Sequence, residues 1–409
     1  MHLGEHIVRF SMGSIPVVGN TVAGAIVGLT PSGAQLCDRM LEQDVAETEV
    51  PNDCRELVEY LQAHGFLASQ NAVRETSIKS AYLHVTNRCN LDCIGCYSRD
   101  SARNRAEDPS LEDLQRAVRL LADLGITQLI ISGGEPFMRG DLAEIARTAK
   151  ECGVAKVVVL TNGMLCSQER LVELQGVVDT ISVSFDGASA EDPAFIRGSQ
   201  LYRRLVSAVR DITDAGIHAH ILVTLHAKNI EDVPRYLTLG EMLKATVGFS
   251  LLSGRESELG DLYPSEGCLA RLAEIMFEHN ASNGDGAVAH TEDVGLRACV
   301  SCGAGRTGVS VAADGSIYPC HMLQHPEFCL GNAFCDTEGH LRKEIARFVL
   351  PTVDEMAGCS SCDKRYLCGG GCRARAYRQY DEIEKKDPYC TFYRNIICAA
   401  VEELNDTYH

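Results

Sequence analysis

The stretch HVTNRCNLDCIGCYS, residues 84–98, decides how this chain of 409 residues is interpreted. Its three cysteines, Cys89, Cys93 and Cys96, have the spacing C-x3-C-x2-C and follow an apolar, strand-like run, Tyr82–Thr86. Cysteine thiolates are the usual ligands of iron–sulfur clusters. Three thiolates hold only three irons of a four-iron cube, so one iron would stay open to a ligand that is not protein.

A glycine-rich turn follows the next strand-like run, Gln128–Ser132. It reads Gly133-Gly134-Glu135-Pro136. Two glycines let a backbone approach a ligand closely. The carboxylate and the free carbonyl groups of such a turn can accept hydrogen bonds from an ammonium group.

Residues 78–255 alternate between strand-like and helix-like runs, which predicts a parallel α/β sheet. Such folds bind ligands at the carboxyl ends of their strands, where the cysteines and the glycine-rich turn both lie. The expected strands are Tyr82–Thr86, Gln128–Ser132, Lys156–Thr161, Thr180–Phe185, His218–Leu225 and Val247–Leu252. The expected helices include Leu111–Leu124, Asp141–Cys152 and Tyr202–Ala215.

The cysteine spacing followed by GGEP resembles the motifs of the radical S-adenosylmethionine (SAM) family. The resemblance implies a partial barrel of six β/α units over residues 78–255, with the amino and carboxylate groups of SAM on the open iron. It also implies that the GGEP segment contacts the SAM amino group. Many family members carry an aromatic residue just before the third cysteine, whereas this chain has Gly95 there and Tyr97 after Cys96.

Further SAM contacts follow from the same resemblance. Asn162 lies in the TNG segment that ends the third strand, and Ser184 lies in SVSFDG at the end of the fourth. In the family, a serine at the position of Ser184 and a basic side chain from the following helix hold the SAM carboxylate. The basic candidates are Arg197, Arg203 and Arg204, of which Arg204 is favoured.

A second cysteine pattern occupies the C-terminal part of the chain. It runs C-x12-G-x4-C, then C-x2-C-x5-C-x3-C, and ends with one more cysteine. This pattern resembles the SPASM domain, which extends many radical SAM enzymes that modify peptides. The matching cysteines are Cys302, Cys320, Cys359, Cys362, Cys368, Cys372 and Cys390.

The resemblance implies two auxiliary clusters, of the 4Fe-4S type like the first. The first auxiliary set then lacks a fourth protein ligand, for which Cys299 is the candidate and Cys329 and Cys335 are weaker rivals. An iron left open to the substrate is the other option. Zinc is the alternative metal, because C-x2-C pairs bind it readily. The first set is Cys302, Cys320 and Cys372, and the second is Cys359, Cys362, Cys368 and Cys390.

Three further units flank the predicted barrel. Residues 256–298 are expected to form a bridging helical region and residues 299–409 the SPASM domain. Residues 1–72 are predicted to be a small α+β unit, which weakly resembles the winged-helix peptide-recognition domain of maturases of ribosomally made peptides. A simple cap on the barrel is the alternative. Its expected elements are strands His6–Ser11 and Ala25–Leu29, and helices Pro31–Glu42 and Asn52–His64 with Thr30 and Asn52 as N-caps.

Composition narrows the class of protein. The formal charge of -18 argues against nonspecific binding to nucleic acid or anionic membranes, and no window has the length and apolar purity of a transmembrane helix. Nineteen cysteines in a long chain without an export signal favour cluster ligands over a disulfide scaffold. We therefore expect a cytoplasmic protein that binds neither nucleic acid nor membrane.

His321, which follows Cys320 in YPCHML, is the candidate catalytic side chain. Sulfatase-maturing members of the family carry an aspartate there that accepts a proton as the substrate is oxidised. Histidine titrates near neutrality and can serve the same purpose. A hydrogen bond from His321 to a cluster or to the backbone is the alternative role.

The resemblance implies an enzyme that splits SAM and takes a hydrogen atom from a ribosomally made precursor peptide. The product would be a thioether, a carbon–carbon crosslink, an oxidised side chain or a decarboxylated residue. A reductant such as flavodoxin or ferredoxin would be a second partner. The alternatives are a SPASM enzyme acting on a small molecule such as a tetrapyrrole, and a non-catalytic iron–sulfur electron carrier or regulator.

Overall fold

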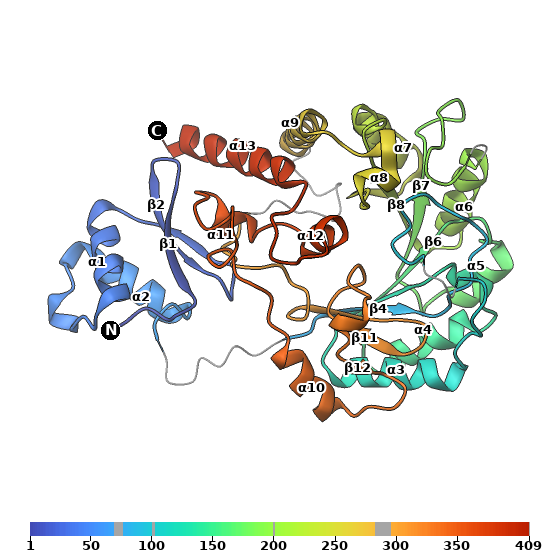
Figure 1. Ribbon diagram of the computed structural model, residues 1–409, viewed down its shortest axis with the longest axis horizontal. Coiled ribbons are helices and arrows are strands. Elements are labelled where there is room, and N and C mark those ends of the chain that lie inside the picture. The colour runs from blue at the N-terminus through green and yellow to red at the C-terminus, as the bar shows by residue number, and fades with distance from the viewer. Residues whose placement is uncertain (69–76, 100–102, 199–200, 283–295, 409) are drawn as a thin grey trace.

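The computed structural model describes residues 1–68, 77–99, 103–198, 201–282 and 296–408. Its centre is a nine-stranded sheet in the order β12-β11-β10-β4-β5-β6-β7-β8-β9 (Figure 1). Six neighbouring strands of this sheet are parallel, as the alternation of strands and helices predicts. They are β4 (Ser80–His84), β5 (Gln128–Ser132), β6 (Lys156–Thr161), β7 (Thr180–Phe185), β8 (His218–Leu225) and β9 (Thr246–Leu251).

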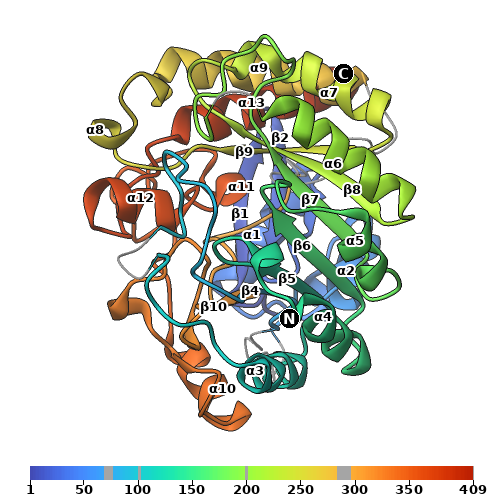
Figure 2. The same cartoon turned by 90° about the vertical axis from the view of Figure 1, so that its right-hand side faces the viewer.

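Helices cover the outer face of these strands (Figure 2). In β7, Ile181, Val183 and Phe185 are fully buried in the core beneath the helices, while Ser182 and Ser184 point to the other face. The helices match this outer face with apolar side chains at helical spacing. They are α3 (Leu111–Asp123), α4 (Leu142–Glu151), α5 (Gln168–Leu174), α6 (Tyr202–Asp214) and α7 (Val233–Leu243).

The sequence did not indicate that the cysteine-rich region would join the same sheet. Strand β10 (Gly308–Val311) pairs in parallel with β4, and β11 (Ser316–Tyr318) and β12 (Gly331–Asn332) continue the sheet antiparallel. These strands are too short to give a readable alternation. Because Cys320 follows β11, the sheet brings that cysteine close to the barrel strand that leads into the first cysteine motif.

The N-terminal residues form a separate three-stranded antiparallel sheet with two helices. Thr30 caps α1 (Pro31–Glu42) as predicted, with its side chain accepting from the Gly33 N–H. Asn52 does not cap a helix. It begins a 3-10 turn, Asn52–Cys54, and α2 (Arg55–Ala63) follows that turn without a side-chain cap. The strands are β1 (Ile7–Met12), β2 (Ile15–Asn20) and β3 (Ile26–Gly28), of which β2 was not predicted.

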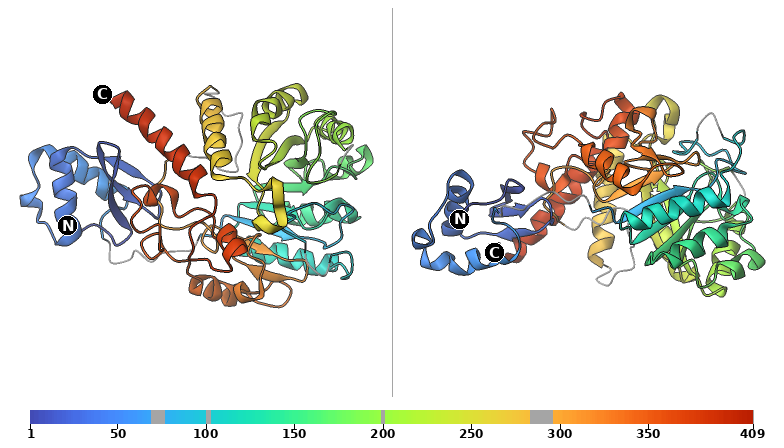
Figure 3. Two further views of the ribbon diagram at one scale, coloured as in Figure 1. Left: turned by 45° about the horizontal axis from the view of Figure 1, so that its top comes forward. Right: turned by 90° about the horizontal axis from the view of Figure 1, so that it is seen from below.

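This N-terminal unit packs against the cysteine-rich region and not against the barrel helices (Figures 1 and 3). The Phe10 ring lies 5.7 Å from the Tyr366 ring, and the Ser14 hydroxyl donates to Asn405 at 2.9 Å. The cysteine-rich region contains α10 (Glu338–Arg347), α11 (Arg365–Cys368), α12 (Arg373–Tyr380) and α13 (Cys390–Tyr408).

Two helices lie between the barrel and the cysteine-rich region in the sequence. They are α8 (Glu256–Leu259) and α9 (Glu266–Ser282), and α9 lies beside α13. Residues 283–295 of the predicted bridging region lie outside the described residues. Within the described part of the chain, no helix has the length and apolar character needed to cross a membrane.

The GGEP turn after β5 is pressed against the cysteine-bearing loop after β4. The Gly134 N–H donates to the Thr86 carbonyl at 2.7 Å, and the Glu135 N–H donates to the Arg88 carbonyl at 2.8 Å. A Cβ atom on Gly134 would lie 2.1 Å from the Arg88 carbonyl oxygen, and one on Gly133 would lie 2.4 Å from that of Thr86. The glycines are therefore required by the approach of another backbone segment.

We expect Gly134→Ala to destabilise the protein by about 1–3 kcal/mol, because the clash is with backbone that cannot rotate away. Urea unfolding of the purified chain measures this loss. Gly140→Ala is the matched control, since its Cβ would meet no atom within 4 Å. Equal unfolding midpoints for the two variants would contradict the steric argument.

Candidate active site

Cys89, Cys93 and Cys96 lie together in the loop at the carboxyl end of β4, each partly exposed. Burial raises the pKa of the Cys89 and Cys93 thiols. Burial also acts on Cys96, but hydrogen bonds from Ser98 and the charge of Arg103 outweigh it and hold the pKa of Cys96 below its ordinary value. Cys96 is thus the thiol most ready to ligate as a thiolate.

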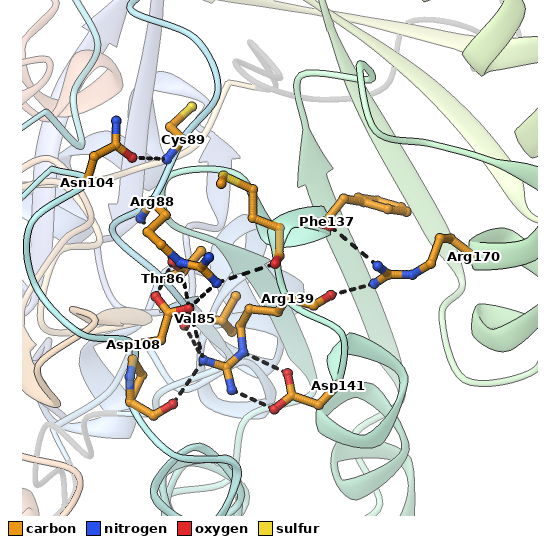
Figure 4. Close-up of polar contacts among 12 residues, drawn as sticks. Val85, Thr86, Arg88, Cys89, Asn104, Asp108, Phe137, Arg139, Asp141 and Arg170 are labelled. Atoms are coloured by element: carbon orange, nitrogen blue, oxygen red, sulfur yellow. Dashed lines mark hydrogen bonds and ion pairs between the residues drawn. The ribbon is translucent and has the colours of Figure 1, made fainter.

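A charged network fixes both ends of this loop (Figure 4). The Asp108 carboxylate accepts from the Thr86 hydroxyl and the Arg88 guanidinium, and Arg139 lies 3.9 Å from the same carboxylate. Arg139 is only 6% exposed, donates to the Val85 carbonyl at 3.2 Å, and pairs with Asp141. The network joins the end of β4 to the segment after GGEP, so the cysteines stand on a rigid base.

The Glu135 carboxylate is fully buried and fully engaged within the protein. It accepts from the Phe137 N–H at 3.0 Å, the Thr161 hydroxyl at 2.8 Å and the Asn162 N–H at 2.7 Å. Burial raises the pKa of Glu135, and these three hydrogen bonds oppose that rise. The carboxylate therefore ties the ends of β5 and β6 together, which differs from the expected role as an acceptor for an ammonium group.

The rest of the GGEP turn is also placed by these contacts. Pro136 begins a 3-10 turn, Pro136–Met138, and the Gly133 carbonyl accepts from the Ser98 hydroxyl at 2.9 Å. Asn162 contacts the cysteine loop directly, because its side-chain amide donates to Asn90 at 2.7 Å and lies 4.0 Å from the Cys89 sulfur. The predicted residues Gly133 and Asn162 thus contact the cysteine loop, and Pro136 begins the turn that follows GGE.

The basic candidates for the SAM carboxylate differ in position. Arg204 donates to the Met164 and Cys166 carbonyls behind β6 and lies 3.7 Å from Asp211, so its guanidinium is already engaged. Arg203 is exposed on the same helix. Arg197 sits at the carboxyl end of β7, where it donates to the Phe185 carbonyl at 2.9 Å.

Arg197 is also electrostatically coupled to the cysteine loop. Burial raises the pKa of the Cys93 thiol, and the Arg197 charge is the largest influence opposing that rise. The Asp186 carboxylate fixes the Arg197 backbone by accepting its N–H at 2.8 Å. Ser184 is half-buried on the inner face of the same strand end. Arg197 and Ser184 therefore share one strand end, and the Arg197 charge acts on Cys93, whereas the guanidinium of the favoured Arg204 is engaged by the carbonyls of Met164 and Cys166.

An aromatic group inside the barrel contains the predicted catalytic residue. The His321 ring stacks on Tyr82 at 4.1 Å and meets the edge of Tyr97 at 5.1 Å. Tyr97 in turn lies 5.9 Å from His84 and is hydrogen-bonded through its hydroxyl to Ser132 at 2.9 Å. This contact joins the residue after Cys96 to the residue after Cys320.

Burial controls the charge of this aromatic group. It lowers the pKa of His321 to about 4 and raises that of Tyr82 to about 12. Burial, aided by His321 and Arg103, lowers the pKa of His84 to about 3, and its Nε2 atom has no hydrogen-bond partner. At neutral pH the group is uncharged. Sequence reasoning missed Tyr82 and His84, although their alternate positions before the cysteines placed both on the inner face of β4.

Two residues at the strand ends, His226 and Ser253, each have a buried polar atom without a hydrogen-bond partner. Neither residue was predicted from the sequence. The His226 Nδ1 atom accepts from the Lys228 N–H, so its Nε2 atom carries the proton, and that buried N–H has no partner. The Ser253 hydroxyl is likewise buried without a partner. Both residues follow parallel strands, β8 and β9. Position at a strand end was the signal that would have found them.

The C-terminal cysteines line two cavities. One has a volume of about 400 Å³, and its cysteines are Cys302, Cys320, Cys368 and Cys372. The other has a volume of about 430 Å³, and its cysteines are Cys359, Cys362, Cys368 and Cys390.

These cavities separate the cysteines into nearly the two sets that the SPASM resemblance implies, with Cys368 at the boundary. Cys299 does not line either cavity, but its sulfur would lie 2.9 Å from a Cβ atom on Gly369. Burial raises the pKa of Cys299 to about 11. Cys329 and Cys335 are exposed and line neither cavity.

Within the part of the chain that the structure describes, no group of three or more His, Cys, Asp and Glu side chains is placed to hold a single metal ion.

Comparison with known proteins agrees with the motif and the sheet. A sequence model described as the Radical SAM superfamily matches residues 83–239. An uncharacterized protein of Archaeoglobus fulgidus is 30% identical over 353 residues, 81% of this chain and 82% of that protein. The AdoMet-dependent heme synthase of Methanosarcina barkeri is 27% identical over 75% of this chain and 95% of its own. The mycofactocin maturase MftC of Mycolicibacterium smegmatis is 27% identical over 75% of this chain and 81% of its own.

Solved structures share the fold at low sequence identity. The structure of anSMEcpe with bound AdoMet superposes with a TM-score of 0.65 at 17% identity, covering 80% of this chain and 98% of that one. Streptococcus suis SuiB bound to its precursor peptide SuiA superposes with a TM-score of 0.60 at 16% identity, covering 95% and 99%. The motif, the parallel sheet and these likenesses together show that this chain is an enzyme of the Radical SAM superfamily.

Proposed function

We propose that the chain is a radical SAM enzyme with a SPASM domain over residues 299–409, and that it modifies a ribosomally made precursor peptide. The observation that carries the proposal is the pair of cysteine-lined cavities beside a barrel whose first loop holds three more cysteines. Relatives named as peptide maturases and the fold shared with SuiB, solved with its precursor peptide, support a peptide as the substrate.

In this proposal Cys89, Cys93 and Cys96 hold three irons of a 4Fe-4S cluster. With SAM on its open iron and one electron from a reductant, this cluster would supply a 5′-deoxyadenosyl radical, the chemistry needed to take a hydrogen atom from the substrate. Arg197 and Ser184 hold the SAM carboxylate, because both lie at the end of β7. The protonated Nε2 atom of His226 is a donor free to bind the cofactor.

His321 is proposed to accept a proton from the substrate. It lies inside the barrel between Tyr82 and Tyr97, and burial keeps its ring neutral at physiological pH. A neutral imidazole has a free lone pair and can therefore act as a base. Its neighbour Cys320 places it beside the first auxiliary cavity, where an electron from the substrate would be received.

The inner surface of the barrel favours an uncharged reacting group. From the middle of the parallel strands to their carboxyl ends, the inward positions of these fully described strands carry no Asp, Glu, Lys or Arg. Tetrapyrrole precursors carry several carboxylates, whose burial requires cationic partners. The neutral surface thus supports a peptide side chain over a tetrapyrrole. The inward residues are Tyr82, His84, Ile130, Ser132, Val158, Leu160, Ser182, Ser184, Leu222, Thr224, Gly248 and Ser250.

The N-terminal unit, residues 1–72, is proposed to bind the precursor peptide. Its β3 strand is an edge of a three-stranded sheet, and an extended peptide can add to such an edge through main-chain hydrogen bonds. Flavodoxin or ferredoxin is the proposed reductant. A cytoplasmic location follows from the need to keep such clusters and thiols reduced.

The first test is iron content and SAM cleavage after anaerobic reconstitution. We expect about twelve irons per wild-type chain, from three four-iron clusters, and 5′-deoxyadenosine when SAM and dithionite are added. A variant with Cys89, Cys93 and Cys96 all replaced by alanine should retain about eight irons and form no nucleoside. Zinc in place of iron at the C-terminal cysteines would overturn the two auxiliary clusters.

The second test separates the two arginines. Arg197→Met should weaken SAM binding about tenfold to a hundredfold, because a hydrogen bond to a charged group contributes about 1.5–3 kcal/mol. Arg204→Met should leave SAM affinity near the wild-type value, since its guanidinium is engaged by backbone carbonyls. Equilibrium binding of SAM to the reconstituted enzyme measures both. The reverse order of effects would restore Arg204 as the carboxylate ligand.

The third test concerns His321. His321→Phe keeps an aromatic ring against Tyr82 and Tyr97 but removes both ring nitrogens. We expect turnover of the cognate precursor peptide to fall about a hundredfold or more, while SAM cleavage without peptide is unchanged. His325→Phe is the control, because that exposed ring contacts Phe328 and Tyr377 instead. Normal peptide turnover by His321→Phe would refute a base at this position.

A further inference from the structure

Arg373 is the largest fully buried side chain in the described part of the chain, with no exposed surface. It is the first residue of α12 and directly follows Cys372. Taking an ion out of water costs several kcal/mol unless a counter-charge is present. A fully buried arginine therefore needs a negatively charged partner to balance its charge.

No carboxylate fills that role. The Arg373 guanidinium donates to the Gly370 carbonyl at 2.7 Å and to the Gly369 carbonyl at 3.1 Å, and its Nε atom has no hydrogen-bond partner. Within the described residues, Arg373 forms no ion pair with Asp or Glu. Arg375, two residues later and also buried, differs in this respect because it pairs with Asp387 at 2.9 Å.

The backbone beside Arg373 is shaped to receive it. Gly369, Gly370 and Gly371 all have left-handed φ values, +62°, +81° and +71°, which glycine adopts without strain. A Cβ atom on Gly370 would lie 2.4 Å from the Arg373 Nη2 atom. The three glycines turn the chain around the guanidinium and present two carbonyls to it. Carbonyl groups satisfy its hydrogen bonds but do not balance its charge.

Arg373 lies between the two sets of C-terminal cysteines. Arg373 is among the residues that line the cavity of Cys302, Cys320 and Cys372, while Gly370 and Gly371, the turn around its guanidinium, line the cavity of the second set. One buried cation thus borders both cavities.

We propose that Arg373 is the shared counter-cation of the two auxiliary clusters and makes both easier to reduce. The proposal rests on the cluster assignment of the proposed function. Clusters bound by thiolates are anionic, and their reduction potentials depend on net charge and hydrogen bonding around them. A nearby cation in a low-dielectric interior stabilises the more negative, reduced form. Arg373 acts through the clusters and does not contact the substrate.

The test is to measure the reduction potentials of the auxiliary clusters in the reconstituted enzyme. A redox titration monitored by electron paramagnetic resonance gives these potentials. The signal that changes when SAM is added belongs to the SAM-binding cluster. The signals that do not change are then assigned to the auxiliary clusters. Arg373→Met should lower both auxiliary potentials, with reduction at least tenfold less favourable, or about 59 mV for one electron. Arg373→Lys keeps the charge and should shift both potentials by much less.

Arg378→Met is the matched control, because it removes one positive charge from the same helix where the side chain is partly exposed and 3.8 Å from Glu258. Its auxiliary potentials should equal those of the wild type. If Arg373→Met loses auxiliary iron, the proposal still requires that Arg373→Lys keeps it at nearly wild-type potential.

Two results would overturn the proposal. Unchanged auxiliary potentials in Arg373→Met would show that the charge is not felt by the clusters. Equal losses of iron or potential in the lysine and methionine variants would show that only the shape of arginine is needed. Wild-type enzyme without auxiliary iron would instead refute the cluster assignment itself, so the two failures are distinguishable.

Discussion

The contact between two backbone segments, the turn after β5 and the loop after β4, is the constraint on which the rest of the site depends. Hydrogen bonds from Gly134 and Glu135 to the loop carbonyls hold the cysteines at the mouth of the barrel. The Glu135 carboxylate then extends the same connection to the end of β6. Three strand ends are thus fixed relative to one another by buried hydrogen bonds, which are costly to break in an interior without water.

A ring contact and strand pairing also join the barrel to the cysteine-rich region. Tyr97 and His321 each follow a predicted cluster ligand, and their rings meet inside the barrel. Strands β10 and β11 bring these two residues together by continuing the central sheet. Strand pairing therefore sets how the segment after Cys96 and the segment after Cys320 lie relative to each other.

Much of the fold could be predicted because its signals are local. Four of the six parallel strands have the predicted bounds, since each is a short segment rich in β-branched and apolar residues. Strands β10 to β12 could not be predicted, because two to four residues give no periodicity and their pairing partner lies far away in sequence. Asn52 failed as a cap because a 3-10 turn precedes the α-helix there.

For the site, the sequence predicts which residues take part, but it does not predict which groups each of them contacts. The cysteine spacing identified the thiols, but the glycines of GGEP prove to accommodate backbone, and Glu135 is occupied by Thr161 and Asn162. Helix spacing alone could not tell Arg197 from Arg204, because the difference lies in which carbonyls each guanidinium reaches. Arg373 carried no signal, since burial of a charge is a property of the folded chain.

The pairing of β10 with β4 also bears on how this chain can be divided. A β4 strand without β10 would be an edge of the sheet, with a row of unpaired backbone groups next to the cysteine loop. Such an edge readily pairs with another chain and leads to aggregation. The barrel therefore depends on the cysteine-rich region to complete its sheet, and a truncated barrel would need a substitute strand to cover the edge of β4.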